Sequence, residues 1–231
     1  MTLKKTTIIV AGGSGMRMNA EIPKQFIELS SKPILMHTIE AFYSFDPTMR
    51  IILVIPAMQH DFWKKLCLKH QFAINHQLVF GGENRFQSVL NGLKMVDDAD
   101  LIAIHDGVRP LVSQYTIQKC FDTAMQLGNA IPTTECIESI RELTLDNNTA
   151  VDRSKYRLIQ TPQVFESRTL KAAYTQDYSS FFTDDASVVE SYFATNDPNA
   201  KIHLVDGNRE NIKITTPYDL IIAEAILKNE F

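Results

Sequence analysis

Three glycines and two cations near the start of the chain have the types and the spacing of a phosphate-binding loop. Gly12, Gly13 and Gly15 fall within four positions, and Arg17 and Lys24 follow them. Because glycine has no Cβ atom, backbone N–H groups can approach an anion closely and form a concave anion site. The two cations can then meet phosphate charge from outside the loop. The stretch predicts a nucleoside triphosphate site, and the alternative is a glycine-rich turn with two solvated cations.

The spacing of these glycines excludes two common nucleotide-binding motifs. A P-loop needs the pattern G-x-x-x-x-G-K-[ST], which residues 11–24 do not contain. The dinucleotide fingerprint needs a third glycine at position 18, which is Met18. The sequence therefore disfavours an NAD-dependent dehydrogenase.

Apolar runs alternate with helical patterns along the chain, which is typical of a mainly parallel α/β sheet. The runs that predict strands are residues 6–10, 51–55, 77–80 and 101–104. Helical patterns at 58–71 and 83–95 lie between them. The clearest helix follows Ser113, which can cap its start, and ends at Gly128.

Two later stretches predict helix starts. In the sequence TDDAS we expect Thr183 to be the N-cap, with Asp184 and Asp185 complementing the helix dipole rather than binding a metal. In TTPYD, Thr216 is the expected N-cap and Pro217 lies in the first turn. The residues expected on the buried side of this last helix are Leu220, Ile221, Ala225 and Ile226.

Three motifs follow predicted strands directly, and parallel strands bring their carboxyl ends to one edge of a sheet. They are the glycine loop, the pair Gly81 and Gly82, and Asp106. Asp106 is the best candidate for a Mg²⁺ ligand, because a nucleotide-bound Mg²⁺ takes one or two carboxylates; the alternative is a turn cap. The neighbouring His105 is expected to serve packing or hydrogen bonding rather than to act as a base.

Residues 133–160 interrupt the alternation. They contain no helix-length apolar stripe, and Asp146-Asn147-Asn148 is a strong turn signal. A plain surface loop of this length would be unusual in a compact domain. We therefore predict a β-hairpin arm that protrudes from the domain.

Composition predicts one globular domain over residues 1–231. The net charge of −4 disfavours nucleic acid as a partner, and no apolar run has membrane-spanning length. The apolar stretch after the basic start is too short for a signal peptide, so a cytoplasmic protein is expected. Cys67, Cys120 and Cys136 lack the spacing of a zinc site or a disulfide scaffold, and the first two are expected to be core residues.

The pattern AGGSGMRM followed by PKQF resembles the nucleotidyltransferases that couple a sugar or polyol phosphate to a nucleotide. Among these, the chain is most similar to the 2-C-methyl-D-erythritol 4-phosphate cytidylyltransferases (the IspD family) of the non-mevalonate isoprenoid pathway. The motifs that continue the resemblance along nearly the whole chain are GGENRFQSV, HDGVRP, VDR, TPQVF, TDDAS and NIKITTPYD. The resemblance implies a Rossmann-like three-layer α/β nucleotidyltransferase fold with a mainly parallel sheet and a protruding β-arm.

The resemblance also implies a reaction and a set of site residues. CTP and 2-C-methyl-D-erythritol 4-phosphate would give a cytidine diphosphate product and pyrophosphate, with Mg²⁺ as cofactor and Asp106 as its ligand. The residues implied to bind the nucleotide are Ala11, Gly12, Gly13, Gly15, Gly82, Ser88 and Asp106. Those implied to bind the acceptor are Arg109, Arg153, Thr161 and Lys213. Those implied to be catalytic are Arg17, Lys24, Arg153 and Lys213.

In this family the arm embraces a second subunit and completes its active site, so the resemblance implies a homodimer in which Arg153 reaches the site of its neighbour. Cys136 stands where the family commonly has a phosphate-binding threonine, and a thiol is a weaker hydrogen-bond donor than a hydroxyl.

Two alternative functions stay open. One is the same chemistry on ribitol 5-phosphate, although VDR, RFQSV and TDDASVVE favour methylerythritol phosphate. The other is a non-catalytic nucleotide-binding protein, because a fold does not fix a function.

Overall fold

A computed structural model describes residues 3–12 and 22–228 of the chain. The strands of its main sheet are β1 (Lys5–Val10), β4 (Arg50–Ile55), β5 (Gln77–Phe80), β6 (Leu101–Asp106), β7 (Asn129–Glu135), β10 (Arg157–Ile159), β11 (Gln163–Glu166) and β12 (Leu204–Asp206). The helices are α1 (Ile34–Phe45), α2 (His60–Lys69), α3 (Arg85–Leu93), α4 (Gln114–Leu127), α5 (Ser167–Ala173), α6 (Asp185–Asn196) and α7 (Pro217–Lys228). Among the described helices, none combines the length and apolar character needed to cross a bilayer.

The sheet is parallel on one side and mixed on the other, where β10 and β11 pair antiparallel and β12 pairs parallel to β7. Its strand order is β10-β7-β11-β6-β1-β4-β5, with β12 added to β7. Strands β6, β1, β4 and β5 run parallel, whereas β11 is antiparallel to both β6 and β7. The expected strands at 6–10, 51–55, 77–80 and 101–104 are confirmed as β1, β4, β5 and β6.

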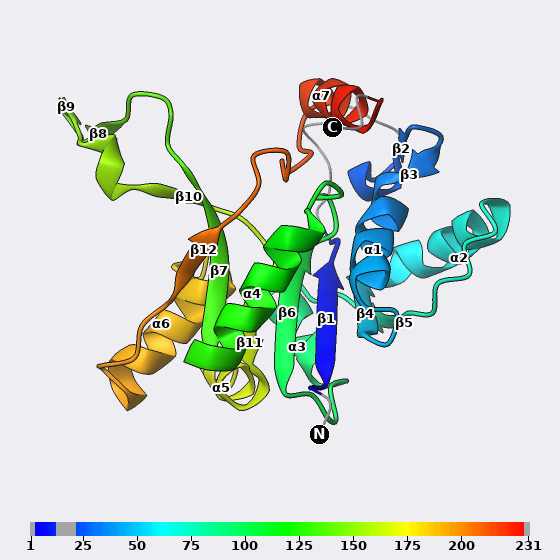
Figure 1. The fold of residues 1–231 in the computed structure, drawn as a ribbon, viewed down its shortest axis with the longest axis horizontal. Coiled ribbons are helices and arrows are strands. Elements are labelled where there is room, and N and C mark those ends of the chain that lie inside the picture. Colours follow the sequence, from blue (N-terminus) through cyan, green and yellow to red (C-terminus); the bar gives the residue numbers. More distant parts are fainter. Residues whose placement is uncertain (1–2, 13–21, 229–231) are drawn as a thin grey trace.

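Helices cover both faces of the sheet, which gives three layers (Figure 1). Helices α1, α2 and α4 pack over one face on a core that includes Ile9 and Leu53. Helices α3, α5 and α6 pack over the other face, where Ile8 and Val54 are buried. Adjacent residues of one strand thus enter opposite cores, which explains why these strands are continuous apolar runs.

A buried aromatic cluster joins α2 to a short helix near the glycine loop. The 3-10 helix η2 (Lys24–Phe26) carries Phe26, whose ring stacks on Trp63 of α2 with centroids 6.0 Å apart. Trp63 is fully buried, and its Nε1 donates a hydrogen bond to Nε2 of His76 at 2.8 Å. Another 3-10 helix, η3 (Ala57–Gln59), follows β4 and leads into α2. The cluster therefore fixes η2 against α2.

A two-residue turn connects the short strands β2 (Glu28–Leu29) and β3 (Lys32–Pro33). Both turn residues have left-handed backbone conformations, with φ of 50° at Ser30 and 67° at Ser31. This geometry usually carries Asn-Gly, because a side chain is strained at such angles. The left-handed conformation of this turn is therefore imposed by the packing around it, because serine does not favour it.

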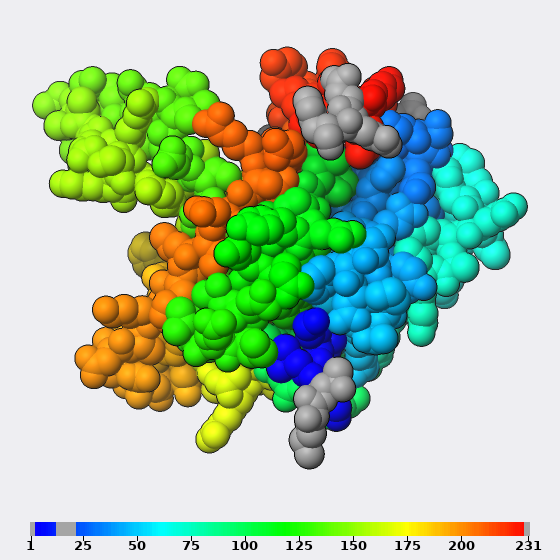
Figure 2. Space-filling view, viewed as in Figure 1, coloured from blue at the N-terminus to red at the C-terminus, as the bar shows by residue number. Residues whose placement is uncertain are grey.

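The segment at 133–160 protrudes from the body as an extended arm (Figures 1 and 2). Strand β7 leads into it, β8 (Arg141–Leu143) and β9 (Asn148–Ala150) form an antiparallel hairpin at its tip, and β10 returns alongside β7. The 3-10 helix η4 (Arg153–Lys155) precedes β10. All residues of β8, β9 and β10 are exposed.

Helix α7 begins at Pro217 after Thr216, as expected, and Thr216 Oγ1 accepts the N–H of Asp219 at 3.3 Å. The start of α6 differs from expectation by one residue. Asp184, not Thr183, is the N-cap of α6, and it forms a capping box with Ser187. A carboxylate accepts hydrogen bonds from the free N–H groups of the first turn more strongly than a hydroxyl does. Helix α4 begins after Ser113 and ends at Gly128, as predicted.

The expected buried side of α7 is right for Leu220 and Ile226, which are partly buried, and wrong for Ile221 and Ala225. The helix covers only one end of the fold, where Ala223 is fully buried and Leu220 and Leu227 are partly buried. Ile221 is 65% exposed and Ala225 is also exposed. Because α7 touches a small cluster and not a sheet face, its buried stripe is narrower than its apolar content suggested.

Cys120 lies fully inside the core, as predicted, and burial raises the pKa of its thiol to about 12. Cys67 is partly buried against the same core.

Candidate active site

The strand ends that the sequence singled out meet at one edge of the sheet. Asp106, the last residue of β6, pairs with the last residue of β1. The next residue, Ala11, donates its N–H to Val54 O at 2.9 Å, and Gly81 does the same to Ile55 O at 2.9 Å. The start of the glycine loop thus lies between Asp106 on one side and Gly81 on the other. This convergence is confirmed.

The glycine loop is described only at its ends. Ala11 and Gly12 follow β1, whereas Gly13, Gly15 and Arg17 lie outside the described residues. The amide of Gln25 donates to Ala11 O and to Gln59 Oε1, both at 2.8 Å. Because Gln25 follows Lys24 in η2, these bonds hold Lys24 near the end of β1.

The motif that contains Gly82 and Ser88 folds onto itself. Ser88 Oγ accepts the N–H of Gly82 at 3.0 Å and donates to Asn84 O at 2.8 Å. Asn84 caps α3 by accepting the N–H of Gln87 at 2.8 Å. A Cβ atom on Gly82 would lie 2.2 Å from Cγ of Gln87, so only glycine fits there. The two residues implied to read the base are therefore held in one rigid turn.

Three cations surround the carboxylate of Asp106. Its Oδ2 lies 2.9 Å from Lys213 Nζ and 3.3 Å from Arg109 Nε, and its Oδ1 lies 3.8 Å from Arg85 Nε. Burial alone would raise the pKa of Asp106, but Arg85, Lys213 and Arg109 outweigh it and hold the pKa well below its usual value. Asp106 is therefore ionised, and the cluster keeps an excess of positive charge.

Arg85, which sequence reasoning missed, belongs to a buried network on the other side of Asp106. Its guanidinium forms two hydrogen bonds with the carboxylate of Asp185, at 2.9 and 2.6 Å. Tyr174 OH donates to the same carboxylate at 2.6 Å, and Asp185 is fully buried. The available signal was the position of Arg85 inside the motif GGENRFQSV, but its partner lies 100 positions away.

His105 is buried and neutral, as expected of a packing residue. Burial lowers its pKa to about 4, although the Arg109 carbonyl and the Asp106 carboxylate act in the opposite direction. Its Nε2 lies 3.1 Å from Arg109 O, so Nε2 carries the proton and Nδ1 accepts from the hydroxyl of Thr161 at 3.0 Å. With both ring nitrogens engaged, His105 is not available as a general base.

Thr161 holds the backbone of Asp106. Its Oγ1 accepts the N–H of Asp106 at 3.1 Å while its proton goes to His105. Contact with an acceptor phosphate would require this second bond to be exchanged. Arg109 donates from Nη1 to Asn211 O at 2.8 Å and is mostly buried. Asp106, Arg109, Thr161 and Lys213 are thus brought together.

Arg153 is not part of this cluster within the chain. It is exposed on the arm, where Nη1 donates to Ile137 O. Among the described residues, no hydrogen bond or ion pair joins Arg153 to Asp106, Arg109 or Lys213.

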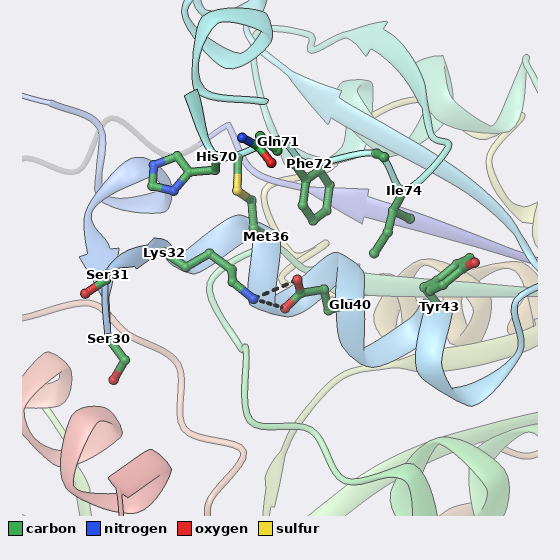
Figure 3. A pocket seen from close by; sticks show the side chains of 11 residues that line it. Ser30, Ser31, Lys32, Met36, Glu40, Tyr43, His70, Gln71, Phe72 and Ile74 are labelled. Carbon is green, nitrogen blue, oxygen red and sulfur yellow. Dashed lines mark hydrogen bonds and ion pairs between the residues drawn. The ribbon is translucent and has the colours of Figure 1, made fainter. Parts of the chain in front are cut away.

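A pocket also opens between the β2–β3 turn, α1 and the connection from α2 to β5 (Figure 3). Lys32 and Glu40 face each other in it, with Lys32 Nζ 2.7 Å from both carboxylate oxygens (Figure 3). None of the predicted site residues lines this pocket. Because Lys32 and Glu40 neutralise each other, this pocket lacks the excess positive charge that the Asp106 cluster offers to an anion.

Comparison with known proteins decides the family. The model of the family "IspD: 2-C-methyl-D-erythritol 4-phosphate cytidylyltransferase" matches residues 6–229. The chain belongs to the IspD family. A relative named 2-C-methyl-D-erythritol 4-phosphate cytidylyltransferase from Bacteroides thetaiotaomicron is 50% identical over 225 residues, which cover 97% of this chain and 100% of the relative. One of the same name from Lachnospira eligens is 38% identical over 96% of this chain and 99% of its own length.

Solved structures of IspD proteins share the fold. The 4-diphosphocytidyl-2C-methyl-D-erythritol synthase of Anaerococcus prevotii is similar with a TM-score of 0.82 and 29% identity, over 98% of this chain and 96% of that one. The IspD structure from Francisella tularensis gives a TM-score of 0.75 and 28% identity, over 96% and 99%. The three-layer α/β fold with a mostly parallel sheet is therefore confirmed.

Among the described residues, the site offers a metal ion one carboxylate, that of Asp106, and not a set of several protein ligands. Asp185 is engaged by Arg85 and Tyr174, and Asp184 caps α6. Within residues 3–12 and 22–228, no group of three or more His, Cys, Asp or Glu side chains could hold a metal ion. Mg²⁺ that arrives on a nucleotide needs only one or two carboxylates, because phosphates and water fill the other positions. Asp106 fits that requirement.

Proposed function

We propose that this chain transfers the cytidylyl group of CTP to 2-C-methyl-D-erythritol 4-phosphate and releases pyrophosphate. The observation that carries the proposal is the cluster of Arg85, Arg109 and Lys213 around Asp106, beside the end of β1, in a chain of the IspD family. An excess of fixed positive charge at a glycine loop suits a reaction between two phosphate-bearing substrates.

The proposed chemistry is an in-line displacement. A phosphate oxygen of the acceptor attacks the α-phosphorus of CTP, the new P–O bond forms, and the bond to pyrophosphate breaks. A phosphate monoester has a second pKa of about 6 and is largely ionised at pH 7, so no general base is needed. The neutral, doubly hydrogen-bonded His105 agrees with this.

Different cations serve the two halves of the reaction. Lys24, held near the end of β1, and Arg17, outside the described residues, would compensate charge on the triphosphate. Lys213 has a side chain that is 44% exposed, so its Nζ can turn from Asp106 toward an acceptor phosphate. Arg109 is only 13% exposed and stays fixed by Asp106 and Asn211. Fixed charges need little reorganisation when the transition state forms.

Asp106 would hold the divalent cation that accompanies CTP. Its Oδ2 is bonded to Lys213 and Arg109, whereas the nearest cation to Oδ1, Arg85, lies beyond hydrogen-bond distance at 3.8 Å. Oδ1 is thus the oxygen that can accept a ligand. The cation, when bound, neutralises charge on the nucleotide phosphates.

We further propose that the arm makes the chain a homodimer, working in the cytoplasm where CTP is made. The arm exposes large apolar side chains that no core of its own covers: Ile137 55%, Leu143 78%, Leu145 103% and Leu158 55%. A patch of this kind favours a protein interface. Arg153 of the partner subunit would then supply a guanidinium, which matches phosphate geometry. Light scattering should give a dimer, and a fully active monomer would overturn this part.

Pyrophosphate release tests the reaction. We expect release with CTP and methylerythritol phosphate, less with UTP, and little with ribitol 5-phosphate. Lys24→Ala should lower kcat by about 10²-fold or more, because one fixed charge at the reacting phosphates is lost. Lys69→Ala is a matched control, since Lys69 pairs with Glu28 at the surface. A preference for ribitol 5-phosphate would show that the acceptor is misassigned. CTP binding without pyrophosphate release for either acceptor would show that the protein is a non-catalytic nucleotide-binding protein.

A further inference from the structure

Four residues of the acceptor half form a closed ring of hydrogen bonds. The N–H of Asp106 donates to Thr161 Oγ1 at 3.1 Å, and Thr161 O accepts from Asn211 Nδ2 at 2.8 Å. Asn211 O accepts from Arg109 Nη1 at 2.8 Å, and Arg109 Nε returns to Asp106 Oδ2 at 3.3 Å. The ring joins the end of β6, the turn after it, the segment before β11 and the segment that carries Lys213.

Asn211 is the member of the ring with the least contact with solvent. It is fully buried, and its Nδ2 also lies 3.3 Å from Oε1 of Gln160 at the base of the arm. Its own Oδ1 has no hydrogen-bond partner among the described residues. A buried acceptor without a partner costs free energy, so an amide here is poorly explained by stability alone. Its two N–H groups instead bind Gln160 at the base of the arm and Thr161, the residue that holds the backbone of Asp106.

The ring also determines which nitrogen of the Arg109 guanidinium remains available to a ligand. Its Nε and Nη1 are engaged by Asp106 and Asn211, and the hydrogen bonds of the described residues leave Nη2 available. Lys213 follows Asn211 by two positions, so anchoring Asn211 also places the backbone from which Lys213 reaches Asp106. One buried amide therefore sets the direction of two cations.

We infer that Asn211 is a positioning residue that orients Arg109 and Lys213 toward the acceptor phosphate; the inference rests on the proposed function. Because it is fully buried, we do not expect it to touch either substrate. Its loss should weaken acceptor binding and leave CTP binding nearly unchanged, because among the described residues neither Gly12 nor the Gly82 turn is hydrogen-bonded to it.

The test compares Asn211→Asp with wild type at constant temperature below the melting point. The aspartate side chain has the same shape as the asparagine amide. It places an oxygen acceptor, and not an N–H donor, opposite Thr161 O and Gln160 Oε1, so both hydrogen bonds donated by Asn211 are lost. We expect calorimetric titration of methylerythritol phosphate into protein loaded with a CTP analogue that cannot release pyrophosphate to show affinity reduced by about 10- to 100-fold, the effect of misdirecting a charge-assisted hydrogen bond. The affinity for CTP should change by less than about twofold. At lower pH the buried acid takes up a proton and regains a donor toward Thr161 O, so acceptor affinity relative to wild type should recover.

Asn208→Asp is the matched control. Asn208 is also an amide of this region, but it accepts from Ser113 N at 3.1 Å and donates to Leu111 O at 3.0 Å at the start of α4. It should lower the melting temperature without changing the ratio of the two affinities. If Asn211→Asp does not fold, Asn211→Ser replaces it with the same readout. Wild-type acceptor affinity in the folded Asn211 variant, or equal loss for both substrates, overturns the inference. Absence of pyrophosphate release in the wild type overturns the proposed function alone, because the binding ratio is still measured.

Discussion

Arg153 lies on the arm and Lys213 lies beside Asp106 in the body, so a site shared between subunits would draw them from different chains. Two inactive variants, Arg153→Ala and Lys213→Ala, should then complement each other when co-expressed. In the mixed dimer, the Lys213→Ala subunit contributes an intact arm to the Arg153→Ala body. That one site has both cations, and the other site has neither.

The size of the recovery follows from this arrangement. Random pairing gives half mixed dimers with one intact site of two, so the mixture should regain about a quarter of wild-type turnover. Mixed dimers purified with two different tags should reach about half. Arg153 is exposed and its contact with Ile137 O lies within the arm, so its replacement should change stability by no more than about 0.5 kcal/mol. Lost turnover in that variant therefore reports on the site and not on folding.

A pair of body variants provides the control. Lys24→Ala and Lys213→Ala both damage the body that carries them, so their mixed dimer has no intact site and should stay inactive. Pyrophosphate release measures both mixtures at equal total protein. If Arg153→Ala with Lys213→Ala remains as inactive as the control, the arm acts within its own chain or not at all, and the shared site is refuted.

Three predictions concern stability and can be measured by thermal unfolding. The pKa of Asp106 is held below its usual 3.8, so its ionised form stabilises the fold above that pH and this stabilisation is lost as the pH falls. The melting temperature of Asp106→Asn should therefore depend less on pH between about pH 5 and 2 than that of wild type. Asp185→Asn removes the charged partner of Arg85, whose side chain is 28% exposed, and should cost about 1–3 kcal/mol, less than for a fully buried pair. The Mg²⁺ concentration needed for activity should not change, and a shift in that requirement would indicate that Asp185 is a metal ligand. Ser31→Gly relieves a left-handed residue at φ 67° and should stabilise by about 0.5–1 kcal/mol after the larger unfolded-state entropy of glycine is subtracted, and a lower melting temperature would contradict the strain.

The edge of the sheet could be predicted from the sequence because its strands are buried on both faces. Such strands appear as unbroken apolar runs, and the residues that follow them must share one edge. This reasoning placed Ala11, Gly81 and Asp106 together without knowledge of pairing. The resemblance to the family then supplied Lys213, which lies far along the chain but contacts Asp106 at 2.9 Å.

The buried polar networks could not be predicted in the same way. Arg85 and Asp185 meet across 100 positions, and Asn211 meets Thr161 across 50. Nothing in local periodicity distinguishes a charged residue that will be buried in a pair from one on a solvated helix face. The cap of α6 was misplaced by one residue for a related reason, because Thr183, Asp184 and Asp185 are all good capping types and only the packing of Asp185 against Arg85 fixes the register.

The only tryptophan of the chain has a use in the laboratory. Trp63 is sealed from water, stacked on Phe26 and bonded to His76, and Phe26 shares a three-residue helix with Lys24. If Lys24 binds the triphosphate as proposed, a displacement of that short helix would reach the indole ring through the contact between Phe26 and Trp63. If the proposed function holds, the emission of this single fluorophore should change when the nucleotide binds and should not respond to the acceptor, whose proposed residues Arg109 and Lys213 do not contact the Trp63 cluster. Trp63 emission would then be an intrinsic probe of the order in which the two proposed substrates bind.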